Sequence, residues 1–444
     1  MSLDSSADRT TSSSAGRLTI NGVTGRLAAS LRSLAQRMTT LHVFIALFVV
    51  AFLFRAVYSL IAATVDPIMS GDPLMGDAAS YDRIARSLMA GGGYGEVPGE
   101  PSAFWPPLYP AFLAGLYSIA GYELLTARLV NSAFGALVPI LVYLIAIRLF
   151  DRRVALVAAV GSVFYPLFIV LGSWVIPDGP YIVFVCLIVL LMLEIQERPR
   201  ASMYVALGVT LGLAYLLKPV TAFFLPFMIP WFLLSLRSVP VRHRWIAGIT
   251  TALVLAAVLT PWTVRNLVVL GDPIVGSANG GYTFYGANNP DAFGGHYEHF
   301  PERIPEMSEG EEQMHFYRLG VEWIRNDPAA FLSVQVQKFR RLASPLSISS
   351  SPQDLTVPGE RIVRFSYTIF LLLAFSGLVI ASRHLRRNGL LLIPLLAVLA
   401  STAVFYGDAR YTMPAVPVLL IWAAVALVLV WDRFRRSRES HLGS

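Results

Sequence analysis

The chain has 444 residues, of which 55% are hydrophobic and 14% are charged, and its mean hydropathy is +0.60. Soluble domains carry about 25% charged residues, so this composition excludes an ordinary soluble protein and predicts a polytopic membrane protein. The net charge of +7 does not indicate nucleic-acid binding, because the arginines form short clusters between apolar segments, as membrane orientation signals do. The single cysteine, Cys186, excludes a disulfide or a cysteine-based metal site within one chain.

Residues 1–38 are rich in Ser, Thr and Arg and are expected to form a mostly disordered cytoplasmic N-terminus. Within them, residues 26–38 have the pattern of a short basic amphipathic helix that could lie on an anionic leaflet. A cleaved signal peptide is not expected, because the polar region is too long and the following apolar stretch too extended.

Ten apolar segments follow, each close to the roughly 20 residues that cross a bilayer as a helix. They are 42–64, 127–150, 154–174, 178–195, 203–218, 220–236, 246–264, 366–382, 390–406 and 411–431. A shorter apolar segment at 108–122 could span the membrane or lie in its interface. If it does not span and the N-terminus is cytoplasmic, every arginine-rich short loop is cytoplasmic, which satisfies the positive-inside rule.

The expected fold is therefore an all-α polytopic membrane protein with about 10–12 transmembrane helices. Its expected parts are an N-terminal membrane module at 39–264 that includes an outer loop at 65–126, an outer segment at 265–365, further membrane helices at 366–432 and a cytoplasmic tail at 433–444. Residues 271–305 read as loop. Residues 310–343 carry a helical pattern that Pro328 interrupts, so two helices are expected there.

Asp77 is the first candidate for chemistry, because it lies in an acidic stretch just beyond the first span, beside Tyr81 and Asp82. Asp77 and Tyr81 share a helical face at a spacing of four residues. The alternative is that Asp77 only caps a helix that starts near Ala78. Asp178 begins another span and offers the same two interpretations, because an acid there is costly unless it faces a cavity or the interface.

Aromatic and basic residues complete the set of candidates at the outer face. Trp105 and Tyr109 could stack on a sugar ring or anchor the chain at the membrane interface. Three cationic side chains lie near the outer ends of different spans. Their common location favours one phosphate site over three separate side chains that extend to the lipid head groups. These cations are Lys218, Arg265 and Arg410, and two further arginines lie within or at the start of a span, Arg55 and Arg128.

No metal site is expected. His296 and His299 lie near Glu298 and Glu302, but their spacing matches no zinc signature, and the GxSxG and HExxH motifs are absent. A divalent metal would therefore have no motif to support it, and no cofactor is expected.

Several stretches together resemble the GT-C glycosyltransferases, in the bacterial branch similar to protein O-mannosyltransferases and to the lipid A aminoarabinose transferase. They are GDAASYDRIARSLMAGGGYG at 76–95, FWPPLYPAFLAGL at 104–116, the long segment 127–156, PDGPYIVF at 177–184, LLKP at 216–219, the segment 261–290 and GDARYTMPAVPVLL at 407–420. The resemblance covers most of residues 42–431. Its order and topology are more specific than any one motif.

The resemblance implies a polyprenyl-phosphate sugar donor, a hydroxyl acceptor on a lipid, glycan or protein, and inversion at the anomeric carbon. It implies that Asp77 holds and deprotonates the acceptor, that Asp178 assists, and that Lys218, Arg265 and Arg410 bind the donor phosphate, with Arg55 as a further candidate. Acceptor or sugar contacts are expected from Tyr81, Asp82, Trp105, Tyr109 and Arg128. Ala78 follows Asp77, where related sequences often carry a second acid.

The expected location is the cytoplasmic membrane of a bacterium, with the site on the outer side. Two other classes of function stay open at this point. A flippase for lipid-linked sugars would have charged residues along a path through the bundle. In a noncatalytic assembly protein, the charged residues at the outer face would have no common role. Loss of sugar transfer in an Asp77→Asn variant would distinguish the enzyme from both.

Overall fold

The computed structural model describes residues 39–61, 64, 74, 76–236, 239–295, 304, 306–347 and 359–442. Over these residues the secondary structure consists of helices, without a strand, so the all-α prediction is confirmed. The expectations for residues 1–38 lie outside the described residues.

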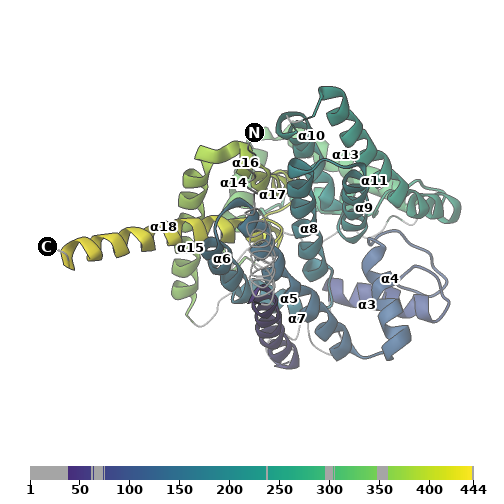
Figure 1. The fold of residues 1–444 in the computed structure, drawn as a ribbon. Coiled ribbons are helices and arrows are strands. Elements are labelled where there is room, and N and C mark those ends of the chain that lie inside the picture. Colours follow the sequence, from purple (N-terminus) through teal and green to yellow (C-terminus); the bar gives the residue numbers. More distant parts are fainter. Residues whose placement is uncertain are drawn as a thin grey trace, which may run out of the picture.

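In the part of the chain that the structure describes, six helices are long and apolar enough to cross a bilayer. They are the first helix (Thr39–Ile61), α5 (Leu124–Leu149), α8 (Asp178–Glu197), α11 (Val241–Leu270), α15 (Glu360–Ala381) and α18 (Val416–Leu442). Each coincides with one of the ten predicted spans. These helices form the body of the bundle seen in Figure 1.

The other four predicted spans are also helical, but they are bent or short. One is α6 (Arg152–Val163) followed by α7 (Pro166–Ser173), which bend by 47°. The others are α9 (Ala201–Leu217), η1 (Pro219–Phe224) with α10 (Leu225–Ser235), and η3 (Gly389–Leu391) with α17 (Leu392–Val404). Pro166 and Pro219 begin the segments after the breaks, as expected of a residue that cannot continue a preceding helix.

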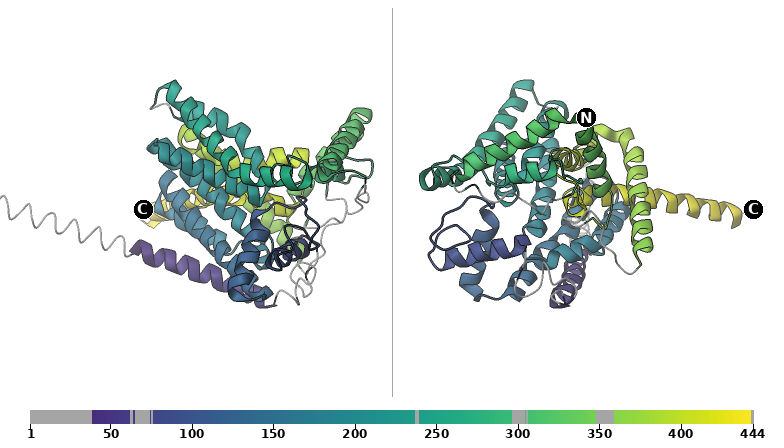
Figure 2. Two further views of the ribbon diagram at one scale, coloured as in Figure 1. Left: turned by 90° about the vertical axis from the view of Figure 1, so that its right-hand side faces the viewer. Right: turned by 180° about the vertical axis from the view of Figure 1, so that it is seen from behind.

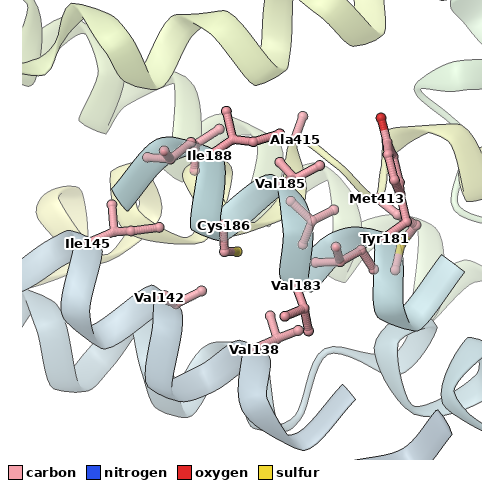
Figure 3. Packing of buried hydrophobic residues seen from close by; sticks show 14 of the residues in the cluster. Val138, Val142, Ile145, Tyr181, Val183, Val185, Cys186, Ile188, Met413 and Ala415 are labelled. Carbon is pink, nitrogen blue, oxygen red and sulfur yellow. The ribbon is translucent and has the colours of Figure 1, made fainter. Parts of the chain in front are cut away.

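Close helix packing depends on small residues and on interlocking aliphatic side chains. Gly208 and Gly212 of α9 form a GxxxG pattern, and a Cβ at either position would approach α11 to 2.6–2.7 Å, so glycine allows the two helices to pack closely. Figure 3 shows α5 and α8 joined by Val138, Val142, Val183 and Cys186. This packing fixes α8, the helix that begins with Asp178.

The arginine-rich loops gather at one end of the bundle. Arg148 pairs with Glu194 at 2.9 Å, Arg153 pairs with Asp432 at 2.9 Å, and Arg387 donates to the backbone carbonyl of Arg148 at 2.6 Å. These contacts join loops that the positive-inside rule assigned to one side. Figure 2 shows the outer segments at the opposite end from the C-terminus.

Among the described residues, five further helices form the end of the bundle away from the arginine-rich loops, which we call the outer end because the arginine placement predicts that it faces outside. They are α3 (Gly76–Met89), α4 (Leu108–Ala120), α12 (Gly280–Ala287), α13 (Glu309–Asn326) and α14 (Pro328–Leu342). α4 has 13 residues, about 20 Å at 1.5 Å per residue, which is shorter than the roughly 30 Å hydrocarbon core. The two helices expected around Pro328 are confirmed, and α13 begins with a capping box between Ser308 and Glu311.

The interpretation of residues 271–305 as loop is wrong at α12. Glycines normally weaken a helix, but here Gly281 lets α12 approach α13 so closely that a Cβ would lie 2.1 Å from the carbonyl oxygen of Gln313. Tertiary packing therefore favours a short helix where local propensity does not. Three short elements complete the described part of the chain: η2 (Ser382–His384), α16 (Leu385–Asn388) and η4 (Ala409–Thr412).

Candidate active site

A cavity of about 1010 Å³ lies at the outer end of the bundle. Its walls come from α3, the loop after it, the junction of α9 with η1, the segment around α12, α13, and the connection between α17 and α18. Among the residues that line it are Asp77, Ser80, Tyr81, Arg83, Phe104, Trp105, Tyr215, Lys218, Asn279, Tyr282, Gln313, Tyr317, Tyr406, Arg410 and Tyr411. Small-molecule pockets usually measure about 300–1,000 Å³, so this cavity has room for more than one small reactant.

Three of the predicted charged residues, Asp77, Lys218 and Arg410, line this cavity, and a fourth, the buried Asp178, contacts two of them. Arg410 donates from Nη1 to Asp77 at 2.9 Å, and from Nη2 and Nε to Asp178 at 2.9 and 3.2 Å. Lys218 donates from Nζ to Asp178 at 2.9 Å. The prediction that these distant parts of the sequence converge is therefore fulfilled by direct contacts.

The two carboxylates lie at helix starts but do not act as helix caps. Asp77 is in the first turn of α3, which starts at Gly76. Asp178 is the first residue of α8, whose N-cap residue, Pro177, provides no side-chain cap. The carboxylates instead accept hydrogen bonds from the cations, so their conformations are set by the ionic cluster.

Asp77 and Asp178 differ in their access to the cavity. The side chain of Asp178 is 3% exposed and contacts both cations, whereas that of Asp77 is 38% exposed and pairs through Oδ2 with Arg410. Among the described residues, no hydrogen bond is made to Oδ1 of Asp77. Asp77 can therefore reach a ligand in the cavity, while Asp178 holds Arg410 and Lys218 in place.

The end of α9 and two aromatic rings determine the position of the Lys218 ammonium at the cavity. Its backbone is extended (φ −147°, ψ 109°), as is usual for a residue before proline. The ammonium lies 5.7 Å from the ring centre of Tyr181 and 5.5 Å from that of Tyr411. An ammonium has three N–H donors, so the bond to Asp178 leaves donors available for an anion.

Arg410 is held by the short helix η4. Asp408 caps this helix by accepting a hydrogen bond from the backbone N–H of Arg410 at 2.7 Å. Burial would lower the pKa of the Arg410 guanidinium, but Asp178 and Asp77 together raise it well above its usual value. Burial also raises the pKa of the Asp408 carboxyl to about 7.

The loop that carries Arg410 is fastened to the outer segment. The N–H of Gly407 donates to the carbonyl of Gly294, and that of Ala409 donates to Ser347, both at 2.8 Å. A Cβ on Gly407 would lie 1.8 Å from the carbonyl oxygen of Lys338 in α14. The outer segment thus contributes directly to the position of Arg410.

Aromatic rings run along the cavity from the helix of Asp77 towards α12. The ring of Tyr81 lies 5.1 Å from Trp105, Phe104 lies 5.5 Å from Trp105, and Phe104 lies 5.4 Å from Tyr282. Glu96 accepts a hydrogen bond from Nε1 of Trp105 at 2.8 Å, which fixes the indole. Tyr81 and Trp105 therefore line the cavity, and their predicted contacts with a sugar or acceptor stay a prediction.

Arg265, by contrast, does not line the cavity. Its guanidinium donates to the carbonyls of Ser102 and Tyr94 at 2.9 and 3.1 Å and lies over the ring of Trp262 at 5.0 Å. Glu309 of α13 accepts hydrogen bonds from the same loop, at Ser102 and at the N–H of the next residue. Arg265 therefore joins the first outer loop to α11.

Asp82 and Tyr109 also lie outside the cavity wall. Asp82 accepts hydrogen bonds from Tyr117 and Tyr122 at 3.0 and 3.3 Å and pairs with Arg86 at 2.9 Å. The hydroxyl of Tyr109 accepts from Asn131 at 2.7 Å. Their contacts hold α3, α4 and α5 together.

Arg55 and Arg128 are buried and are not part of the cavity wall. The guanidinium of Arg55 donates to the carbonyls of Ala51 and Ser162 at 2.9 and 3.4 Å, inside the bundle. Its side chain packs against Gly135 and Gly172, so Arg55 lies inside the bundle, apart from the cavity.

The sequence did not identify the wall formed by the segment around α12 and α13. This wall presents Ser277, Asn279, Thr283, Gln313 and Tyr317 to the cavity. The stretch 279–290 is unusually rich in Asn, Gly and Tyr for a chain of this hydropathy. That local composition is the signal in the sequence that favours a binding surface over a simple connecting loop.

Within the described residues, no group of three or more His, Cys, Asp or Glu side chains has a metal-binding arrangement. His296, Glu298, His299 and Glu302 lie outside the described residues, so the metal site considered for them stays untested.

Comparisons with known proteins agree with the fold. The family model described as dolichyl-phosphate-mannose-protein mannosyltransferase matches residues 105–262, a region that contains Asp178 and Lys218. No curated protein sequence gives a significant match. The GT-C resemblance inferred from the sequence is thus supported independently by a family model.

Solved structures extend the likeness over most of the chain. The oligosaccharyltransferase of Archaeoglobus fulgidus in its apo form has a TM-score of 0.53 at 15% identity, covering 90% of this chain and 52% of its own. The same enzyme with an inhibitory peptide and a dolichol-phosphate has a TM-score of 0.51 at 15% identity, with the same two shares. ArnT from Cupriavidus metallidurans bound to undecaprenyl phosphate has a TM-score of 0.39 at 16% identity, with shares of 86% and 77%.

This chain spans about half the length of the oligosaccharyltransferase structures that it matches. The shared part is the fold of the helical bundle. Together with the helical composition of the described residues and the family match, these structures confirm the predicted fold class.

Proposed function

We propose that this protein is an integral membrane glycosyltransferase that moves a monosaccharide from a polyprenyl-phosphate donor to an acceptor hydroxyl. The observation that carries the proposal is the cavity of about 1010 Å³ that the carboxylate of Asp77 lines together with Lys218 and Arg410. The family match to mannosyltransferases that use dolichyl phosphate, and the dolichol-phosphate bound by an oligosaccharyltransferase of the same fold, support it.

The donor would span two kinds of surface. Its phosphate suits the remaining N–H donors of Lys218 and Arg410. Its hydrocarbon chain suits the apolar side of the cavity, where Val220, Phe223 and Phe405 line the junction of η1 with the end of α17. A lipid-linked sugar could then keep its chain in the bilayer while its head group enters the cavity.

Asp77 is proposed as the general base. Its carboxylate would accept the proton of the acceptor hydroxyl as the acceptor oxygen bonds to the anomeric carbon and the bond from that carbon to the phosphate oxygen breaks. Attack from the side opposite the leaving phosphate inverts the anomeric centre. Asp178 would act as a positioning residue for both cations.

The ionic cluster also suits the movement of charge in this reaction. Two acids and two cations balance one another before reaction. When Asp77 takes up a proton, its pairing with Arg410 weakens at the moment when the departing lipid phosphate gains charge. Arg410 can then donate to the phosphate the hydrogen bond that it gave to Asp77, which stabilises the leaving group electrostatically.

The direct test is transfer of labelled sugar from a panel of polyprenyl-phosphate donors by the purified protein. Asp77→Asn is expected to lower turnover by about 10²–10⁴-fold, the usual range for losing a general base. Asp82→Asn is the matched control, because it makes the same change on the same helix outside the cavity wall. Equal turnover in the wild type and in Asp77→Asn would contradict the assignment of the base.

The proposed reaction uses Lys218 and Arg410 to balance phosphate charge and requires no metal. We therefore expect a chelator such as EDTA to leave transfer unchanged. Loss of transfer that is restored by added Mg²⁺ or Mn²⁺ would show that a cation takes part.

The arginine clusters at the opposite end of the bundle support an orientation with the cavity on the outer side of the cytoplasmic membrane. Labelling of single cysteines, introduced at Arg83 and at Arg436 in a Cys186→Ala background, would test it in intact cells. A membrane-impermeant reagent is expected to label only the first position.

A further inference from the structure

We propose that the cavity wall formed by the segment around α12 and α13 is a subsite for a neutral glycan acceptor. This inference rests on the proposed glycosyltransferase function and specifies the chemical class of its second substrate. Its starting point is a contrast within one cavity: the charged lining residues lie on α3, on η4 and at the end of α9, and the described lining residues around α12 and on α13 carry no charge.

The wall is polar but uncharged. Ser277, Asn279, Thr283, Gln313 and Tyr317 line it, and none of these side chains is ionised at neutral pH. Hydroxyl and amide groups match the hydroxyl groups of a sugar, which both donate and accept hydrogen bonds. An anionic acceptor would have to bring its charge to this wall without a cation to pair with it, which is costly.

The other cation that lines the cavity among the described residues, Arg83, is paired with a carboxylate. Arg83 donates from Nε to Glu96 at 2.9 Å, forms a second contact with the same carboxylate from Nη2, and donates to Ser80 at 3.2 Å. Lys218 and Arg410 belong to the ionic cluster assigned to the donor phosphate. Among the described residues, each cation of the lining is therefore paired with a carboxylate or assigned to the donor phosphate.

Local packing orders the polar wall. Ser277 donates to Oδ1 of Asn279 at 2.8 Å, which fixes the amide of Asn279. In the orientation of its amide that matches the surrounding acceptors, Gln313 donates from its side-chain nitrogen to the carbonyls of Ser277 and Ala278 at 3.1 Å. Among the described residues, Nδ2 of Asn279 and the hydroxyl of Tyr317 make no hydrogen bond, so both can bind a ligand.

Aromatic rings connect this wall to Asp77. Tyr81, Trp105, Phe104 and Tyr282 follow one another at centroid distances of 5.1–5.5 Å. Faces of aromatic rings pack well against the apolar C–H faces of sugars. An acceptor glycan could place its reacting hydroxyl at Asp77 and a further sugar unit along the rings towards Asn279, and the cavity of about 1010 Å³ has room for such a ligand beside the donor sugar.

The test compares acceptors in the transfer assay with full-length protein. The panel consists of two neutral trisaccharides (maltotriose and mannotriose), a serine- and threonine-containing peptide, and a doubly phosphorylated lipid A disaccharide. Asn279→Leu and Tyr317→Phe each remove one hydrogen-bonding group, and are expected to raise KM for a trisaccharide about 3–10-fold with KM for the donor unchanged. Asn326→Leu and Tyr285→Phe are matched controls away from the cavity lining.

Transfer to the peptide or to the lipid A disaccharide, with none to a trisaccharide, would overturn the inference while leaving the proposed function in place. A change in donor KM caused by the two variants would also overturn it, because the wall would then belong to the donor site. Thermal unfolding of each variant separates a lost contact from a lost fold.

Absence of both transfer and donor hydrolysis with every acceptor would count against the proposed function itself. In that case saturation-transfer NMR with maltotriose and mannotriose tests the subsite alone. Binding that is weakened by Asn279→Leu would support a glycan subsite, and no binding of either trisaccharide would overturn it.

Discussion

Arg410 and Arg265, two arginines at the outer end of the bundle, each connect separate segments, but they differ in their position relative to the cavity. Arg410 bridges two carboxylates at the cavity. Arg265 bridges two backbone carbonyls of the first outer loop, and Glu309 accepts hydrogen bonds from that loop. Both arginines lie near the outer end of a bundle helix, and both connect that helix to an outer segment.

The difference lies in what surrounds each guanidinium. Arg410 keeps two of its five N–H groups available at a cavity where charge can change. Arg265 is committed to neutral carbonyls and lies beside the rings of Tyr94 and Trp262. The first arrangement suits binding of an anion, and the second suits the fixed attachment of a loop.

The largest expected effect is at Arg410. Arg410→Ala removes a donor to the proposed leaving phosphate and is expected to lower turnover by at least about 10²-fold. It also leaves the buried Asp178 with one cation, so the protein should lose stability. Steady-state transfer kinetics on folded protein measure the first effect. Arg410→Lys keeps the charge without the bidentate contact and should recover only part of the turnover.

Lys218→Met should weaken donor binding. Its ammonium has donors left for the phosphate, and charge-assisted hydrogen bonds contribute about 1.5–3 kcal/mol, which corresponds to roughly 10–150-fold in KM for the donor. The measurement is the dependence of transfer rate on donor concentration. An unchanged donor KM would show that the phosphate binds elsewhere.

Arg265→Ala should act mainly on stability. Loss of its hydrogen bonds leaves the carbonyls of Tyr94 and Ser102 without this partner, at a cost of about 1–3 kcal/mol. Thermal unfolding in detergent is expected to occur at a lower temperature, while turnover of the folded protein changes little. A loss of turnover as large as that of Arg410→Ala, at unchanged stability, would remove the distinction between the two arginines.

The smallest expected effect concerns Asp408 and pH. Its pKa in the folded protein, about 7, is raised above the ordinary carboxyl value by burial. The folded state therefore holds this proton more tightly than the unfolded state, and the contribution to stability declines as pH rises from about 4 through 7. Asp408→Asn retains the cap to Arg410 and should show a flatter dependence of melting temperature on pH between 5 and 8. An identical pH dependence in wild type and variant would contradict the assignment.

The positions of helices were largely predictable because apolar length and arginine placement are properties of local sequence. All ten predicted spans are helical, but the breaks at Pro166 and Pro219 shorten some of them. α12 escaped prediction because its formation depends on Gly281 packing against α13. That contact is invisible to local propensity.

The charged site was also predictable in part, because the order and orientation of the spans follow from local sequence. Topology places Asp178, Lys218 and Arg410 at one face, and their meeting follows from the antiparallel order of the helices. Whether a given arginine faces a cavity depends on its side-chain partners, which the sequence does not specify. Arg265 and Arg410 therefore received the same predicted role, although the structure separates them.

The central claim is that the donor phosphate binds beside Asp77, at Lys218 and Arg410. A structure of the protein with a bound polyprenyl phosphate tests it most directly. The account predicts phosphate oxygens within hydrogen-bond distance of Lys218 Nζ and the Arg410 guanidinium, with the Asp77 carboxylate facing the open part of the cavity. A phosphate bound at Arg265 or Arg55, with the ionic cluster unoccupied, would contradict it.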